Sequence, residues 1–311
     1  MIEARGVMKK YAIVHPAVFK LDGGAMFGII PKPLWSKLIP ADEQNRIQLS
    51  LRVMLIQTKH RNILVDTGIG DYHGDKFDDR FGVLGPKNPL VEALRTRFNL
   101  GPEDISDLII THLHFDHVGG LGKNQGTHEP LFPNATLHLH RQHYEYALHP
   151  TPRDAGSFQS LYFKPLIEKA IQNGKVNWLE GEEGVILNDE DDHIFFKCSH
   201  GHTPWLVHPF DEKFIYMADL VPTSAHISVP WVMGYDISPG RTTFDKIQFY
   251  AFIIEKDLTM ILEHDVKAWG CKIRKKADSD YEISEIFPTG SLDPEKPELI
   301  SGQYLFSTPQ M

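Results

Sequence analysis

The segment Thr111 to His117 constrains this chain more than any other, because it holds three histidines and an aspartate and comes directly after the apolar run 108–110. Histidine offers a lone pair near neutral pH and a carboxylate supplies compensating charge, so the set suits zinc or a neighbouring first-row metal ion. His112 and His114 alternate and can point the same way, while Asp116 and His117 turn toward an adjacent position. One loop can therefore serve two metal ions.

A second pair of histidines with the same spacing is interpreted differently. The chain has 17 histidines, so one such pair is weak evidence. His138 and His140 lie in the alternating run 135–140, which predicts an ordinary strand, and a surface helix is expected at 141–147. We interpret His138, His140, His143 and His149 as half-buried or solvated side chains that bind no metal.

Three downstream residues of ligand type each follow a short apolar run. They are His202 after 194–196, Asp219 after 214–218 and His264 after 260–263. Loops at strand ends are where a rigid sheet presents catalytic groups. An isolated residue of this kind would be a cap or a turn, but all three together with the upstream motif indicate a shared metal site.

In this order, the motif 112–117 with His202, Asp219 and His264 resembles the metal-ligand signature of the metallo-β-lactamase superfamily. The segment 63–70 is similar to the strand, aspartate and glycine element of that superfamily. The resemblance implies an α/β fold, a four-layer αββα sandwich, with two zinc ions. It further implies one metal on His112, His114 and His202, the other on Asp116, His117 and His264, and Asp219 as the bridge between them.

For Asp66, the resemblance implies an outer-shell role that orients a ligating histidine. An ordinary Asp-Thr-Gly turn is the alternative, and both interpretations stay open.

Two metals in this arrangement imply hydrolysis. Metal binding lowers the pKa of water from about 15.7 toward 7, which makes hydroxide available to attack a carbonyl or phosphoryl centre. Asp116 or Asp219 would then carry a proton to the leaving group. His114 stands where the diiron flavoprotein branch has a glutamate, which favours zinc. A mononuclear-iron persulfide dioxygenase keeps the histidines and stays an alternative.

The segment 21–35 resembles the branch that holds N-acyl-homoserine lactonases and methyl-parathion-hydrolase-like enzymes. Met26, Phe27 and Phe115 are candidates for an apolar substrate wall, with core packing as the alternative for any one of them.

The segment 220–235 is rich in proline and aromatic residues and predicts a loop over the site. Pro222 stands where some lactonases place a tyrosine that binds the substrate carbonyl, so His226 or Tyr235 is expected to replace that donor. Trp205 stands where the superfamily commonly has glycine, and we expect its bulk to reshape the adjoining helix or pocket.

Length and composition favour one α/β domain over residues 1–311, because the ligand set extends from 112 to 264 without a linker. A loop is predicted at 71–80 and helices at 90–98 and 243–256. The proline-containing tail 287–311 is expected to be extended and to wrap the domain or meet a partner.

The formal net charge of −9 leaves no electrostatic footprint for a nucleic-acid backbone. Cys198 and Cys271 form no disulfide framework, and neither fits the ligand pattern. The first ten residues lack the apolar core of a signal peptide, and no run approaches the roughly 18 apolar residues of a membrane span. We therefore expect a cytoplasmic protein that acts on a small molecule, without nucleic-acid or membrane partners; a homodimer stays open.

The leading hypothesis is a dinuclear-zinc hydrolase that opens a lactone or related ester, with N-acyl-homoserine lactones among the candidates. A phosphotriesterase or phosphodiesterase on the same metals is the alternative. A non-hydrolytic protein with a structural metal is disfavoured, because every ligand position of the pattern is filled.

Overall fold

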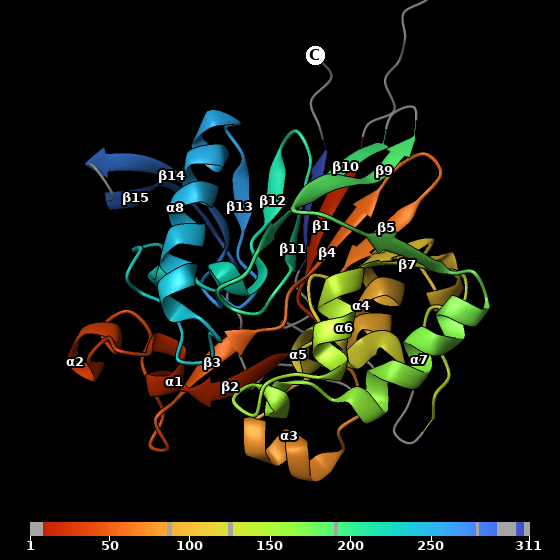
Figure 1. Cartoon of the computed structure of the whole chain (residues 1–311), viewed down its shortest axis with the longest axis horizontal. Helices are drawn as coiled ribbons and strands as arrows, with labels where there is room; N and C mark the ends of the chain where they lie inside the picture. Colours follow the sequence, from red (N-terminus) through yellow and green to blue (C-terminus); the bar gives the residue numbers. More distant parts are fainter. Residues whose placement is uncertain are drawn as a thin grey trace, which may run out of the picture.

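The computed structural model describes residues 9–85, 89–123, 127–189, 192–277, 280–290 and 303–307. Most strands belong to two seven-stranded sheets (Figure 1). The first sheet has the order β16 (Gln303–Ser307), β1 (Lys10–Val14), β4 (Val53–Gln57), β5 (Asn62–Val65), β6 (Asp107–Ile109), β7 (Thr136–His140) and β8 (Val176–Leu179). The second has the order β15 (Asp280–Pro288), β14 (Ala268–Ala277), β13 (Thr259–Ile261), β12 (Phe214–Tyr216), β11 (Leu206–Phe210), β10 (Asp192–Ser199) and β9 (Glu183–Asp189).

A smaller ribbon of β2 (Val18–Asp22) and β3 (Arg46–Ser50) lies beside these sheets. The described α-helices are α1 (Gly23–Phe27), α2 (Lys32–Trp35), α3 (Asp75–Phe81), α4 (Pro89–Phe98), α5 (Phe115–Val118), α6 (Arg141–Leu148), α7 (Ser160–Gln172) and α8 (Pro239–Glu255). Short 3-10 turns occur at η1 (Pro102–Asp104), η2 (Gly119–Leu121), η3 (Ala155–Ser157), η4 (Ala218–Leu220) and η5 (Ser224–His226).

Alternating side chains explain why the two sheets stack. Successive residues of a strand point to opposite faces. In β4, Val53 and Leu55 pack in the cluster that includes α4 and α7, whereas Met54 and Ile56 pack in the cluster between the sheets. Each central strand is therefore buried on both faces, which confirms the predicted four-layer αββα sandwich.

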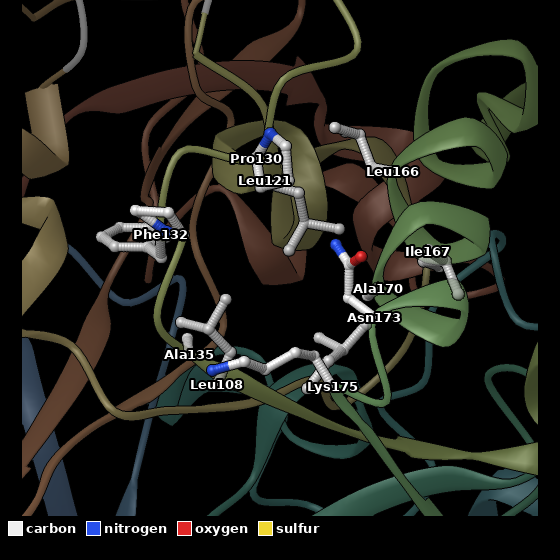
Figure 2. Close-up of a pocket in the computed structure, with 12 residues that line it drawn as sticks. Leu108, Leu121, Pro130, Phe132, Ala135, Leu166, Ile167, Ala170, Asn173 and Lys175 are labelled. Atoms are coloured by element: carbon white, nitrogen blue, oxygen red, sulfur yellow. The ribbon is translucent and has the colours of Figure 1, made fainter.

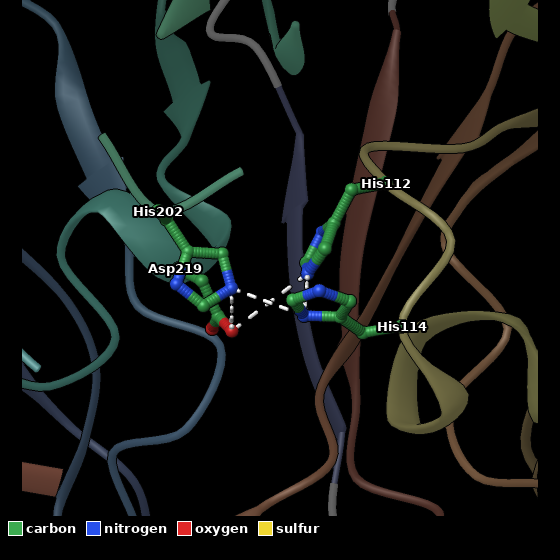
Figure 3. A group of neighbouring side chains, drawn as sticks. All are labelled: His112, His114, His202 and Asp219. Carbon is green, nitrogen blue, oxygen red and sulfur yellow. Dashed lines mark hydrogen bonds and ion pairs between the residues drawn. The ribbon is translucent and has the colours of Figure 1, made fainter. Parts of the chain in front are cut away.

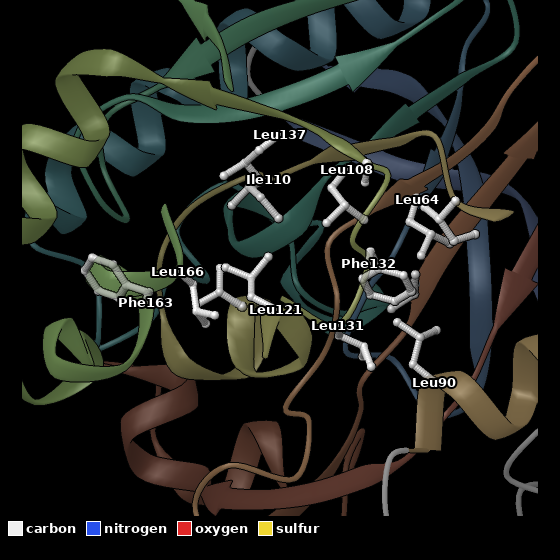
Figure 4. Packing of buried hydrophobic residues seen from close by; sticks show 14 of the residues in the cluster. Leu64, Leu90, Leu108, Ile110, Leu121, Leu131, Phe132, Leu137, Phe163 and Leu166 are labelled. Carbon is white, nitrogen blue, oxygen red and sulfur yellow. The ribbon is translucent and has the colours of Figure 1, made fainter. Parts of the chain in front are cut away.

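The outer clusters hold the helices against the sheets. On the first sheet, Leu90 of α4 and Leu166 of α7 belong to the same apolar cluster as Leu108 of β6 (Figure 4). On the second sheet, α8 packs through Phe249 and Ile253 in the cluster that contains Met260, Cys271 and Ile273. Burial of each such side chain contributes about 1.5–3 kcal/mol to the free energy of unfolding. The helices are therefore packed stably against the two sheets that carry the site.

The predicted helices at 90–98 and 243–256 are confirmed as α4 and α8. The second begins earlier than expected, because Pro239 lies in its first turn, where its fixed φ angle suits a helix start. The surface helix expected at 141–147 and the strand at 135–140 are α6 and β7.

The prediction of a loop at 71–80 is wrong for its second half, because those residues form α3. Phe77 and Phe81 lie one helical turn apart, and their rings lie 5.3 and 5.5 Å from that of Phe115. The helix ends at Gly82, whose φ of 54° is left-handed. Two phenylalanines at this spacing are a local signal for a helix. The many charged residues around them made the segment resemble a loop.

Part of the tail expected to be extended is a strand, since β16 pairs antiparallel with β1. Residues 291–302 and 308–311 of that tail, like residues 1–8, lie outside the described part of the chain. None of the described helices combines the length and the apolar character needed to cross a membrane.

Candidate metal centre

Residues of ligand type gather at one edge of the two sheets. The loop that carries His112 and His114 follows β6 of the first sheet, while His202 and Asp219 follow β10 and β12 of the second. Figure 3 shows these four side chains pointing toward one another from the two sides. The cluster therefore joins the sheets, and it exists only because they stack.

The first group consists of His112, His114, His202 and Asp219, all buried. Nδ1 of His114 lies 3.1 Å from Nε2 of His112 and 3.1 Å from Nε2 of His202. Oδ2 of Asp219 lies 3.0 Å from Nε2 of His202 and 3.8 Å from Nε2 of His112. A tetrahedral zinc ion with bonds of about 2.0 Å spaces its ligands about 3.3 Å apart, so these donor atoms suit one ion.

The second group consists of Asp116, His117 and His264. Oδ2 of Asp116 lies 3.6 Å from Nε2 of His264 and 3.8 Å from Nε2 of His117. Asp219 reaches this group too, because its Oδ1 lies 3.0 Å from Nε2 of His264 and its Oδ2 lies 3.7 Å from Nε2 of His117. Asp219 is therefore placed between the two groups.

Three buried atoms of the two groups lack a hydrogen-bond partner, namely Nε2 of His114, Nε2 of His117 and Oδ1 of Asp219. A buried polar atom without a partner costs about 1–3 kcal/mol, and a bound cation would remove that cost. The buried histidine and aspartate clusters thus fit a binuclear metal site.

Asp66 connects the loop to the preceding strand, as a residue that orients ligands would. Its Oδ2 accepts hydrogen bonds from Nδ1 of His117 at 2.9 Å and from Oγ1 of Thr111 at 2.7 Å. Because Nδ1 of His117 carries the proton, the lone pair of Nε2 is free to face the centre. Oγ1 of Thr111 also lies 3.1 Å from Nδ1 of His112, which holds that ring in the same way. Asp66 has a φ of 61°, so it also occupies a turn.

Two further histidines have their tautomer set by acceptors. Nδ1 of His264 donates to the main-chain carbonyl of Ser50 at 2.8 Å. Nδ1 of His202 faces Oδ1 of Asp236 at 3.0 Å. With Nδ1 of each ring turned toward an acceptor, Nε2 faces the centre, which is the orientation that metal ligation requires. Asp236 was missed by sequence reasoning, since it lies in an irregular segment with no local pattern.

Glu263 was missed as well. Its side chain is completely buried, and its Oε2 lies 3.2 Å from Nδ1 of His117, beside Asp66. Burial raises the pKa of Glu263 to about 7. The available signal was a charged residue at the end of an apolar run, directly before His264.

Electrostatics prepare the donors for a cation. Burial and the neighbouring histidines hold the pKa of His112 and of His114 well below the ordinary value, so both rings stay neutral. Burial opposes ionisation of Asp219, but His202 and His264 outweigh it and hold the pKa of Asp219 well below its usual range. Burial opposes protonation of His202 and His264 as well, but Asp219 outweighs it and raises the pKa of each ring to about 9. A metal ion binds neutral imidazoles, so it would displace a proton from these two rings.

The other histidine pair belongs to neither group in the described residues. Nε2 of His138 lies 2.8 Å from Oδ1 of Asp107, and Nε2 of His140 donates to the carbonyl of Gly181 at 3.0 Å. The expectation that these rings are half-buried or solvated is wrong, because both are buried between structural partners.

His143 is also buried, whereas His149 is exposed as expected. Nε2 of His143 accepts from the main-chain N–H of Leu113 at 2.8 Å, and its Nδ1 donates to the carbonyl of Pro204 at 2.8 Å. His143 therefore braces the loop between His112 and His114 without binding metal.

A cavity of about 300 Å³ opens over the centre. Its wall combines ligand residues with apolar and aromatic side chains and one cation; besides His114, Asp116, His202, Asp219 and His264, it includes Leu21, Met26, Phe81, Phe115, Arg153, Met233 and Tyr235. The substrate-pocket candidates Met26, Phe115 and Tyr235 thus face the cavity.

Phe27 and His226 do not line this cavity, contrary to the expectation for them. Their rings stack at 4.7 Å behind Met26. Nε2 of His226 donates to the carbonyl of Met26 at 2.8 Å, and burial lowers the pKa of His226 to about 3. The His226 ring is therefore part of the core beneath the loop 220–235.

A second cavity, of about 60 Å³, lies between α7 and the first sheet (Figure 2). Leu108, Leu121 and Leu166 are among the apolar side chains that line it. No histidine or carboxylate lines it among the described residues, so it offers no comparable chemistry.

Comparison with known proteins places this geometry in a family. Residues 51–258 match the model of the metallo-beta-lactamase superfamily. An N-acyl homoserine lactonase of Bacillus cereus is 32% identical over 243 residues, which cover 74% of this chain and 87% of that protein. The N-acyl homoserine lactonase AttM of Agrobacterium fabrum is 27% identical over 211 residues, which cover 67% of this chain and 75% of that protein.

Solved structures agree with this fold. A probable metal-dependent hydrolase from Staphylococcus aureus has a TM-score of 0.77 and 26% identity, with 92% of this chain and 98% of that one covered. AidC, a dizinc quorum-quenching lactonase, has a TM-score of 0.69 and 19% identity, with 89% and 94% covered, and shares the fold.

Proposed function

The chain belongs to the metallo-β-lactamase superfamily and is a metal-dependent hydrolase, and we propose that it opens a lactone or related ester at a dinuclear zinc centre. N-acyl-homoserine lactones are the first candidates, since the named relatives include lactonases for them. The observation that carries the proposal is the placement of Asp219 between two buried ligand groups, beneath a cavity with largely apolar walls.

His112, His114 and His202 would hold one ion, Asp116, His117 and His264 the other, and Asp219 would touch both. Two such ions activate a water molecule and polarise the substrate carbonyl. Zinc is favoured because the donors are mainly imidazole nitrogens with two carboxylates.

The protein side chains have separate tasks in this proposal. Asp116 lies at the cavity wall and can pass a proton to the leaving oxygen. Met26, Phe115 and Met233 offer an apolar surface for an acyl chain.

We propose Tyr235 as the hydrogen-bond donor to the substrate carbonyl. Some lactonases use a tyrosine for this at the position that Pro222 occupies here. Within the described residues its hydroxyl has no hydrogen-bond partner, although the ring lines the cavity. Burial raises the pKa of Tyr235 to about 12, so the hydroxyl keeps its proton at neutral pH. It can therefore donate a hydrogen bond to an oxygen that gains charge in the transition state.

A substrate panel on metal-loaded protein tests the proposal. Lactones, aryl esters, phosphotriesters and β-lactams are compared, and we expect lactones or aryl esters to give the highest kcat/KM. Asp116→Ala and His264→Ala should abolish turnover, whereas His149→Ala, at an exposed histidine, should not. Faster turnover of phosphotriesters would favour the alternative activity, and unchanged turnover in the first two variants would refute the mechanism.

A further inference from the structure

Arg153 lines the cavity and has no acidic partner among the described residues. Its Nη2 donates to the carbonyl of Gly234 at 2.5 Å, and its Nε and Nη2 each lie 3.4 Å from the carbonyl of Asp236. Main-chain carbonyls orient the guanidinium group but do not neutralise its charge. The adjacent Asp154 is engaged elsewhere, since its carboxylate accepts from Tyr146 and Thr151.

The other charged groups that line the cavity are already committed. Asp116 and Asp219 belong to the two ligand groups, and the rest of the wall is mostly apolar or aromatic. Arg153 is therefore the one cationic Lys or Arg side chain among the described residues that line the cavity. A guanidinium has five N–H donors, and here Nη1 donates to no described group.

We propose that Arg153 binds a carboxylate of the substrate, so that the preferred substrate is a lactone or ester whose acyl arm carries a carboxylate. This rests on the proposed hydrolysis at the metal centre. The scissile group would lie at the ligand residues, the apolar part of the arm against Met26 and Phe115, and the carboxylate at Arg153.

Energetics favour a carboxylate over a neutral group at this position. Arg153 is exposed, and its hydrogen bond to a charged partner is still stronger than one to a neutral group. The planar guanidinium also matches the two oxygens of a carboxylate. An apolar chain end would leave Arg153 with no new partner.

A matched pair of substrates tests the inference. N-hexanoyl-homoserine lactone and N-adipoyl-homoserine lactone share the scissile ring and the chain length, but only the second ends in a carboxylate. We expect the native protein to prefer the adipoyl compound, and Arg153→Met to lower the ratio of the two kcat/KM values about tenfold. Arg153→Lys should retain part of the preference, and added salt should reduce it.

Arg95→Met is the matched control, because Arg95 is exposed on α4 and does not line the cavity. It should leave the ratio unchanged. If Arg153→Met lowered both kcat/KM values equally, the role of Arg153 would be structural, through the loop of Gly234 and Asp236, and the inference would be refuted.

A binding measurement separates this inference from the proposed function. Calorimetry compares adipate with hexanoate on the metal-loaded protein, and we expect adipate to bind about tenfold tighter and to lose that advantage in Arg153→Met. Equal binding of the two acids would refute a carboxylate site. If neither lactone were opened but adipate kept its advantage, the lactonase proposal would fail while the assignment of Arg153 stood.

Discussion

Asp236 accepts a hydrogen bond from Nδ1 of His202 at 3.0 Å, across 34 positions of the chain. The other oxygen of the same carboxylate accepts from Oγ1 of Thr242 at 2.8 Å, in the first turns of α8. Asp236 therefore joins a metal-site histidine to a long helix and to the loop that carries Tyr235. The orientation of His202 depends on a residue that the metal motif does not include.

Replacement of Asp236 should weaken metal binding. Asp236→Ala removes the acceptor that holds His202, and loss of such a partner costs about 10- to 100-fold in metal affinity or activity. Zinc affinity is measured by competition with a chelator. Asp236→Asn keeps an acceptor oxygen and should lose less; an affinity unchanged in both variants would show that His202 is held by other contacts.

Tyr235→Phe should lower kcat/KM for the best substrate about 100-fold, because it removes one hydrogen-bond donor to the reacting oxygen. Bound zinc, measured by elemental analysis, should stay at the native level, since Tyr235 is not among the ligands. Tyr144→Phe is the control, as Tyr144 packs against Trp178 away from the cavity. Equal rates in Tyr235→Phe and the native protein would exclude the hydroxyl from the reaction.

Because of His208, we expect the protein to be less stable in mild acid than at neutral pH. Burial lowers its pKa to about 3, and the neutral ring is held between Oγ of Ser199 at 2.8 Å and the carbonyl of Tyr216 at 3.2 Å. In the unfolded chain the pKa of histidine is about 6.5. Between these two values the unfolded chain binds a proton that the folded chain does not, so the free energy of unfolding falls as the pH falls.

Because of His208, the free energy of unfolding should fall by about 2 kcal/mol between pH of about 6.5 and about 5. Urea unfolding at both pH values, at equal metal content, measures it. His208→Gln should show a smaller loss of stability on acidification than the native protein. An identical loss in both would mean that His208 is protonated in the folded state as readily as in the unfolded chain.

Trp205 has a φ of 61°, a conformation that favours glycine, which the superfamily commonly has here. Its ring stacks on His140 at 4.8 Å, and that contact offsets part of the backbone strain. Both Trp205→Gly and Trp205→Ala lose the stack, but only glycine relieves the strain. We expect the glycine variant to be more stable than the alanine variant by about 1 kcal/mol, as measured by urea unfolding; the reverse order would show that φ is not strained.

Residues close together in the sequence revealed the chemistry. The upstream ligands could be recognised because they lie close together in the segment 112–117, after a single apolar run. Each downstream ligand could be recognised because it follows an apolar run of its own; these are His202, Asp219 and His264. Strand periodicity and ligand type are local properties, so the residues themselves indicated a metal site at strand ends. The αββα fold was expected from the resemblance of that ligand pattern to the metallo-β-lactamase superfamily. The same local reasoning misjudged residues 75–80, where the phenylalanine pair of a helix is set among charged residues.

The tertiary structure decided how those residues meet and what supports them. His114 and His202 are 88 positions apart, yet their ring nitrogens approach to 3.1 Å, because the two sheets stack through side chains that alternate between faces. Asp236 and Glu263 reach the ligands, His138 and His226 are buried away from the cavity, and Arg153 faces it. These placements arise from packing between segments distant in the sequence, and no local pattern encodes such contacts.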